Sequence, residues 1–226
     1  VHDNRHTPIP GAQIEGLFQP AEDFESDLNG AYEAYTVWPA DQLSASHPAY
    51  GEMTGVLRPF ETERIDMALP PKVNAVINGG FEDDLKNWKV GAGAPYLEGF
   101  SYAHSGRQAL CLNRMLPTST PNSQVVGTMI TLPTAPEHLT LSFFAMRTLN
   151  TMPWDRLSVT IGEEGAAQTP LELHWTDSGK FAHVWAGLEA WRGKTVILLF
   201  RGDLTGVEGE ARLLIDEVSI GDWTTP

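Results

Sequence analysis

One carboxylate, Asp216, lies inside an apolar run that has the alternation of a β-strand facing a core. Ile215 and Val218 flank it, and no lysine or arginine adjoins it in the sequence. A carboxylate that is buried on folding needs a partner, because an unpaired charge is costly to remove from water. Asp216 is therefore a candidate binding residue, the alternative being that it is solvated at a strand end.

A second set of side chains has the chemistry of a sugar-binding site. Sugars present apolar C–H faces and hydroxyl edges, so a site for them combines exposed flat rings with amide, carboxylate or arginine groups. Trp154 is the most suggestive ring, because it lies in a polar loop at residues 150–155 (NTMPWD). The candidate ligand-binding residues are Tyr96, Arg147, Trp154 and Trp175. The alternative for each ring is to cover the core or edge of the protein's own fold.

Motifs of catalysis are absent from the sequence. The seven histidines show no metal-ligand spacing, and there is neither a Gly-x-Ser-x-Gly elbow nor a glycine-rich phosphate loop. The acid pairs at 83–84 and 163–164 are adjacent residues. Adjacent residues of an extended chain point to opposite faces, so neither pair is placed to flank one glycosidic bond. We therefore expect a protein that is not an enzyme.

Composition and charge narrow the class of protein further. Fifteen basic and twenty-nine acidic residues give a formal net charge of −14, which would repel nucleic acid. Glycine and proline occur throughout the length, as in a globular, turn-rich chain. Cys111 is the single cysteine, so no internal disulfide forms, and its apolar neighbours predict a buried, inert thiol. The sequence shows neither a signal peptide nor an apolar run of membrane-spanning length, and we expect an excised or processed piece of a larger protein.

The pattern of apolar residues predicts an all-β chain with two domains. The 226 residues suit two cores of unequal size, divided at the linker Pro70-Pro71-Lys72, because consecutive prolines end sheet pairing. We expect a small Ig-like β-sandwich over residues 1–70 and a larger β-jelly-roll sandwich over 73–223. The strands expected in the second domain span 73–81, 108–113, 123–131, 140–148, 156–161, 180–188, 195–201 and 211–220.

The first domain resembles the carboxypeptidase-regulatory-like family, which has an Ig or transthyretin-like fold. Three motifs of that family occur here in its order, at residues 8–14 (PIPGAQI), 29–32 (NGAY) and 46–50 (SHPAY). Ala49 stands where the family has glycine, which affects only the local turn. The resemblance implies a spacer or supporting module without an active site.

The second domain resembles the galactose-binding-like jelly rolls of the carbohydrate-binding-module type. Its motifs extend from 78–82 (NGGFE), with Trp88 downstream, through 104–110 (HSGRQAL) to 188–196 (LEAWRGKTV) and the closing strand at 214–220 (LIDEVSI). The order and spread of the motifs support the fold more strongly than any one ligand, because this fold serves many partners.

The same resemblance implies a structural Ca²⁺ site where the first and last strands meet. Glu82 and Asp216 hold the family's two acidic positions, and the carbonyl of Gly80 is placed to join them; the loop at Ser105 could add another oxygen. Calcium prefers such oxygen ligands. The alternative is that both carboxylates are merely solvated.

Two functions are the main candidates from the sequence, and a third, an enzyme in its own right, would need a catalytic constellation that forms only in the fold. The first is a non-catalytic, extracellular glycan-binding module, binding an oligo- or polysaccharide within a larger secreted or cell-surface protein. The second is a structural or adhesive segment that assembles with other domains of the same polypeptide or with further copies of itself. Neither requires nucleic acid or a membrane span.

Overall fold

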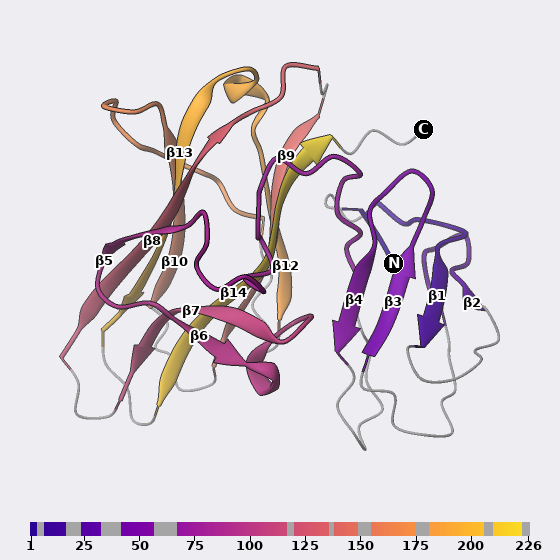
Figure 1. Cartoon of the computed structure of the whole chain (residues 1–226), viewed down its shortest axis with the longest axis horizontal. Coiled ribbons are helices and arrows are strands. Elements are labelled where there is room, and N and C mark those ends of the chain that lie inside the picture. The colour runs from indigo at the N-terminus through magenta and orange to yellow at the C-terminus, as the bar shows by residue number, and fades with distance from the viewer. Residues whose placement is uncertain are drawn as a thin grey trace.

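The architecture is all-β, as the sequence predicts. A computed structural model describes residues 1–3, 7–16, 24–32, 42–56, 67–116, 120–135, 138–148, 155–174, 181–205 and 210–222. None of the helical segments in these ranges has the length or apolar character to cross a bilayer. The described strands of residues 1–71, called here the first region, form one sheet, and those of residues 73–222, called the second region, form a sandwich of two sheets (Figure 1).

The first region has a four-stranded antiparallel sheet in the order β2-β1-β3-β4. Its apolar side chains gather in a cluster that includes Ile14, Met67 and Leu69, all fully buried. The resemblance of this region to carboxypeptidase-regulatory-like modules stays a prediction, as does its independence as a domain. The strands are β1 (Gln13–Gly16), β2 (Phe24–Glu25), β3 (Gln42–Ser46) and β4 (Met53–Val56).

The second region is a sandwich of two five-stranded antiparallel sheets, in the orders β11-β10-β13-β8-β5 and β12-β9-β14-β7-β6. Two 3₁₀ turns, Phe100–Tyr102 and Glu189–Trp191, interrupt it. The strands are β5 (Lys89–Ala92), β6 (Tyr96–Gly99), β7 (Gln108–Met115), β8 (Asn122–Thr131), β9 (Leu139–Arg147), β10 (Arg156–Gly162), β11 (Thr169–Pro170), β12 (Ala182–Gly187), β13 (Thr195–Leu204) and β14 (Ala211–Asp222).

The core of the sandwich lies between its sheets. On β13 the buried Val196, Leu198 and Phe200 alternate with more exposed residues, as expected for a strand with one face in the core. The ring centroid of Phe200 lies 5.1 Å from that of Phe143, across the core on β9. Cys111 is fully buried, and burial raises the pKa of its thiol to about 11, which fits the inert role expected for it.

The expected strand at 73–81 is wrong. This segment consists of bends and turns, and Asn78 and Phe81 both have positive φ. The side chain of Asn78 organises the following turn, since its Nδ2 donates to the carbonyl of Asp84 at 2.9 Å and its Oδ1 accepts from the amide of Asp83 at 3.0 Å. Left-handed residues at 78 and 81 break strand pairing, so only isolated hydrogen bonds join this segment to β14. Three strands, β5, β6 and β11, lie outside the segments expected from the sequence.

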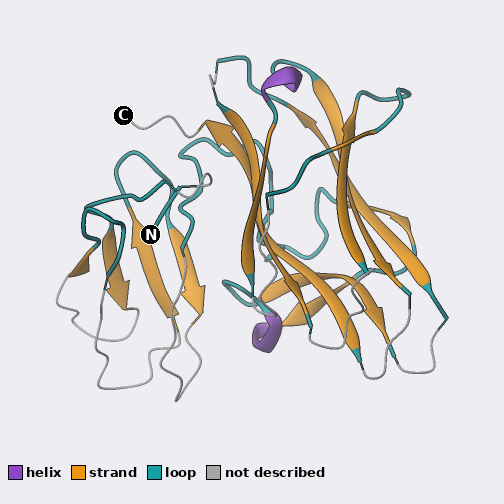
Figure 2. Ribbon diagram, turned by 180° about the vertical axis from the view of Figure 1, so that it is seen from behind, coloured by secondary structure: helices purple, strands orange, loops and turns teal. Residues whose placement is uncertain are grey.

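Strand β9 is buried on both faces, which is unusual for a strand of a two-sheet sandwich. One face lies in the sandwich core, while Phe144 on the other face belongs to the apolar cluster of the first region and is 2% exposed. The two views agree that the sheet of the first region stands beside the sheet containing β9 and β12 (Figures 1 and 2). The first region therefore packs against an outer face of the sandwich.

Replacing Phe144 tests this packing. We expect Phe144→Ala to lower the free energy of unfolding by about 3 kcal/mol, the usual cost of emptying a buried aromatic site. Hydrogen exchange should quicken in β1 and β3 of the first region. Met129→Ala, at a half-exposed position on β8, is the control. It should change neither the free energy of unfolding nor the hydrogen exchange of β1 and β3. Unaltered exchange in β1 and β3 of Phe144→Ala would contradict the packing described here.

Candidate functional site

Glu82 and Asp216 hold the same loop, residues 104–108, from two sides. Oδ2 of Asp216 accepts hydrogen bonds from the amides of His104 at 2.9 Å and Ser105 at 3.2 Å. Oε1 of Glu82 accepts from the amides of Arg107 at 2.7 Å and Gln108 at 2.9 Å. The two acidic residues named from the sequence therefore meet at one loop, although they are far apart in the chain.

A third carboxylate, Glu217, joins this cluster and was missed in the sequence. Successive side chains of a strand normally point to opposite faces. Here β14 has a register shift between Asp216 and Ser219 against β9, and Glu217 has a φ of 53°. As a result Oε1 of Glu217 accepts a hydrogen bond from Oγ of Ser105, whose amide is already bound by Asp216. The acidic doublet inside an apolar strand was the signal that could have revealed it.

Gly80 also lies beside the cluster. A side chain there would begin 3.1 Å from Oε1 of Glu217, so the small residue gives this carboxylate room. Neighbouring Gly79 approaches β14 more closely still, since its carbonyl accepts the amide of Val218 at 3.0 Å. The segment expected to supply a carbonyl ligand therefore runs next to the carboxylates.

The two buried acids of the cluster, Asp216 and Glu217, have raised pKa values. Burial raises the pKa of Asp216 well above its ordinary value, and the nearby charge of Glu217 raises it further, against the lowering effect of its backbone hydrogen bonds. Burial likewise raises the pKa of Glu217, with a smaller contribution from Glu82. A cation placed among these groups would reverse both shifts.

The donors present fit a hard cation, yet they do not form a complete metal centre as they stand. In the described ranges no three histidine, cysteine, aspartate or glutamate side chains converge in the manner of a metal site. The available groups are oxygens only, from carboxylates, a serine hydroxyl and strand-end carbonyls, which is the set that calcium prefers over zinc. Gly80, Glu82 and Asp216 thus remain predicted ligands.

Two of the residues proposed for sugar binding, Tyr96 and Arg147, lie apart in the same sheet. Tyr96 lies on β6 and Arg147 at the end of β9, with β7 and β14 between those strands in the sheet. Nη1 of Arg147 donates to the carbonyl of Asp155 at 2.9 Å. Trp154 and Trp175 lie outside the described residues, so their part of the hypothesis stays a prediction.

Tyr96 belongs to a half-buried polar cluster instead of an open platform. Its hydroxyl donates to Oε1 of Glu98 at 2.7 Å, and Glu98 also pairs with Nε of Arg212 at 2.8 Å. Arg212 lies over the ring of Tyr102, 4.4 Å from its centroid, and donates to its hydroxyl at 3.1 Å. Burial and the bond to Glu98 raise the pKa of Tyr96 far above its ordinary value. The polar groups of this cluster therefore already have hydrogen-bond and ion-pair partners within it.

The other half of the same sheet face is covered by the first region. His183 on β12 lies 5.1 Å from His2, ring centroid to ring centroid, and its Nε2 is 2.7 Å from Oγ of Ser142 on β9. Phe144, next to them, is in the cluster of the first region. A ligand could not lie along β9 and β12 without displacing the first region.

Comparison with known proteins is informative for the fold. The sequence matches no family model, and no curated protein matches it either. Among solved structures, the carbohydrate-binding module TmCBM61 in complex with β-1,4-galactotriose aligns with a TM-score of 0.51 and 15% identity, covering 67% of this chain and 100% of that chain. The second region is therefore a β-sandwich jelly roll of the kind found in carbohydrate-binding modules.

Two further structures align less closely. The CBM22-1–GH10 modules of Clostridium thermocellum xylanase 10B, complexed with xylohexaose, give a TM-score of 0.47 and 13% identity, covering 68% of this chain and 29% of that chain. A structure described for the promiscuous specificity of carbohydrate-binding modules from the β-sandwich superfamily gives a TM-score of 0.43 and 12% identity. The alignment covers 95% of this chain and 86% of that chain.

The raised pKa values predict an unusual pH dependence of stability. The folded chain retains protons on Asp216 and Glu217 that the unfolded chain releases as the pH passes their ordinary values of 3.8 and 4.5. The stabilisation is therefore fully present below those values, and it is lost as the pH rises toward the higher folded-state pKa values.

Urea unfolding in a chelator, from about pH 4 to neutrality, measures the effect. We expect the free energy of unfolding of the native chain to decline with pH more steeply than that of Asp216→Asn. Asp83→Asn, at an exposed carboxylate, is the control and should follow the native chain. Identical slopes for the native chain and Asp216→Asn would show that Asp216 is not protonated on folding.

Proposed function

We propose that this chain is a non-catalytic glycan-binding module of a secreted or cell-surface protein. The observation that carries the proposal is the jelly-roll sandwich itself, which aligns with the whole of TmCBM61, a module described with a bound galactotriose. Supporting it, the surface charge opposes nucleic acid as a partner. The glycan would be an oligo- or polysaccharide that the chain holds for other domains of the same polypeptide.

The absence of catalysis is also part of the proposal. Asp83 forms an ion pair with Lys86 at 3.7 Å, both side chains being about 70% exposed. Glu163 pairs with Lys194 at 3.0 Å, where both side chains are about half exposed. Both acids are exposed, whereas the general acid of a glycosidase is held in a cleft beside the bond that it cleaves. They are better explained as solvated surface charges.

We also propose that calcium binds the carboxylate cluster, with Glu217 added to the predicted ligands Gly80, Glu82 and Asp216. Burial raises the pKa values of Asp216 and Glu217, and a neighbouring acid raises each further, Glu217 for Asp216 and Glu82 for Glu217; one divalent ion would pair these carboxylates. No basic side chain forms an ion pair with Asp216 or Glu217 in the described ranges. When bound, the ion would tie loop 104–108 to β14 and to the segment before β5.

Calcium should therefore stabilise the chain. At a calcium concentration about 100 times its dissociation constant the gain is about 2.7 kcal/mol, which corresponds to several degrees in the melting temperature. The measurement is thermal unfolding in calcium, in magnesium and in a chelator. Glu217→Gln and Glu82→Gln should lose the calcium response, and Glu164→Gln, an exposed acid in another turn, should keep it. Equal melting temperatures with calcium and with chelator would refute the site.

A structural or adhesive segment is the second candidate. The observation that favours it is the packing of the first region on β9, which makes the chain suited to act as a spacer of fixed shape. Filaments or strand exchange seen by electron microscopy would support this role.

Binding to an array of neutral plant and microbial glycans tests the first candidate. We expect the full chain to retain at least one class of glycan in calcium, to be displaced by the same glycan in free form, and to release no reducing sugar from it. The heat-unfolded chain serves as the control, because binding through the fold is lost with the fold. A complete lack of retention would count against glycan binding, and release of reducing sugar would show an enzyme.

A further inference from the structure

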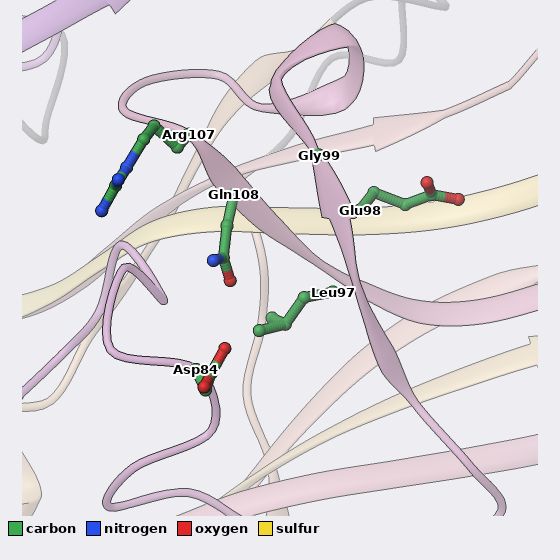
Figure 3. Close-up of a pocket in the computed structure, with 6 residues that line it drawn as sticks. All are labelled: Asp84, Leu97, Glu98, Gly99, Arg107 and Gln108. Atoms are coloured by element: carbon green, nitrogen blue, oxygen red, sulfur yellow. The ribbon is translucent and has the colours of Figure 1, made fainter.

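A hollow of about 440 Å³ opens at the edge of the sandwich, between the hairpin of β6 and β7 and the turn that follows Phe81. Figure 3 shows it beside the open edge of β6. The residues that line it are Asp84, Leu97, Glu98, Gly99, Arg107 and Gln108. Glu98 is the lining residue that this hollow shares with the cluster around Arg212.

The strand register explains why this edge is hollow. Gly99 pairs with Gln108, and Leu97 pairs with Leu110, so Leu97, Gly99 and Gln108 share one face of the hairpin. A side chain at position 99 would stand beside Gln108 over the hollow, and a Cβ built on Gly99 finds no atom within 4 Å. The missing side chain therefore leaves the space open. Glu98 points to the opposite side of β6 (Figure 3).

Gln108 brings an unused hydrogen-bonding group to this space. Its Oε1 is buried and has no hydrogen-bond partner among the residues that the structure describes. Its side chain points toward that of Asp84 across the hollow (Figure 3). A carbonyl oxygen and a carboxylate are both acceptors, so a group placed between them must donate to both. A buried acceptor without a partner is costly, and a bound ligand that donates to it removes that cost.

The remaining walls favour a neutral ligand with an apolar face. Leu97 packs against the sandwich core and offers the hollow an apolar surface. The charges at the rim are opposite, with Asp84 on the turn and Arg107 on the loop, where the Arg107 side chain is 79% exposed. A suitable ligand has hydroxyl groups along one edge, which donate to Gln108 and Asp84, and C–H groups on one face, which pack on Leu97.

We propose that this hollow is the glycan subsite of the chain, holding one sugar ring whose hydroxyls donate to Gln108 and Asp84 and whose C–H face lies on Leu97. This inference rests on the proposed glycan-binding function and specifies its place. The turn is organised in advance, because Asn78 holds the carbonyl of Asp84. The other wall is held by Glu82, which accepts the amides of Arg107 and Gln108. Preformed walls reduce the entropy lost on binding.

Calorimetric titration of the full chain in saturating calcium tests the subsite. The probes are β-1,4-galactotriose, xylohexaose and soluble mannan, together with any glycan retained on the array. Gly99→Trp should fill the hollow and abolish binding. Asp84→Asn keeps the size of the side chain and tolerates the left-handed backbone at this position, and it should weaken binding about tenfold through the loss of a charged acceptor.

Gln108→Leu separates a binding role from a structural one. Removal of an unpartnered acceptor should leave the melting temperature unchanged or raise it, while binding weakens about fivefold or more. Asp83→Asn is the matched control beside Asp84, and it should bind as the native chain does. If Gly99→Trp does not fold, the binding affinities of Asp84→Asn and Gln108→Leu still test whether the hollow holds the glycan.

The outcomes separate the two proposals. Loss of binding in the hollow's variants and not in the control supports the subsite. If the native chain binds a glycan and the variants Asp84→Asn and Gln108→Leu bind it with the same affinity, the subsite proposal is overturned and the glycan-binding proposal stands. A native chain that binds none of the probes and nothing on the array overturns both.

Discussion

The buried carboxylate of Asp216 is the interaction on which the arrangement of the sandwich depends. It lies on β14, the strand between β9 and β7, and all its hydrogen bonds in the described ranges go to backbone amides, two of them in loop 104–105 and one in Glu217. Desolvation of a carboxylate is costly unless such donors surround it. The requirement fixes the loop before β7 against the last strand, and thereby one end of the sandwich.

The same end of the molecule joins three separate features. Glu217 faces Ser105 because β14 departs from regular alternation, Glu82 reaches the amides of Arg107 and Gln108, and those two residues continue into the wall of the hollow beside β6. An ion held by the carboxylates would therefore act on the hollow through the loop they share. Stability and recognition would be coupled through contiguous contacts.

The first region changes what the sandwich can offer to a ligand. Its cluster takes in Phe144, and His2 contacts His183, so the β9 and β12 half of an outer sheet face is occupied from within the chain. The β6 half carries a self-satisfied group of tyrosine, glutamate and arginine side chains. The edge beside β6 remains open, which is why the hollow there is more suitable for a sugar than the sheet face.

The sequence by itself determined the all-β class and the long strands β7 to β10 and β12 to β14, because alternation is a local signal; the placement of Glu82 near Asp216 came from the resemblance to galactose-binding-like jelly rolls. It misplaced 73–81 as a strand, since positive φ at Asn78 and Phe81 is set by contacts with the turn and β14. Only the tertiary structure decided that Glu217 joins Asp216 and that Gly99 opens a hollow before Gln108. Both follow from strand register and a bulge, which arise from pairing between distant segments and leave no periodic trace in the chain.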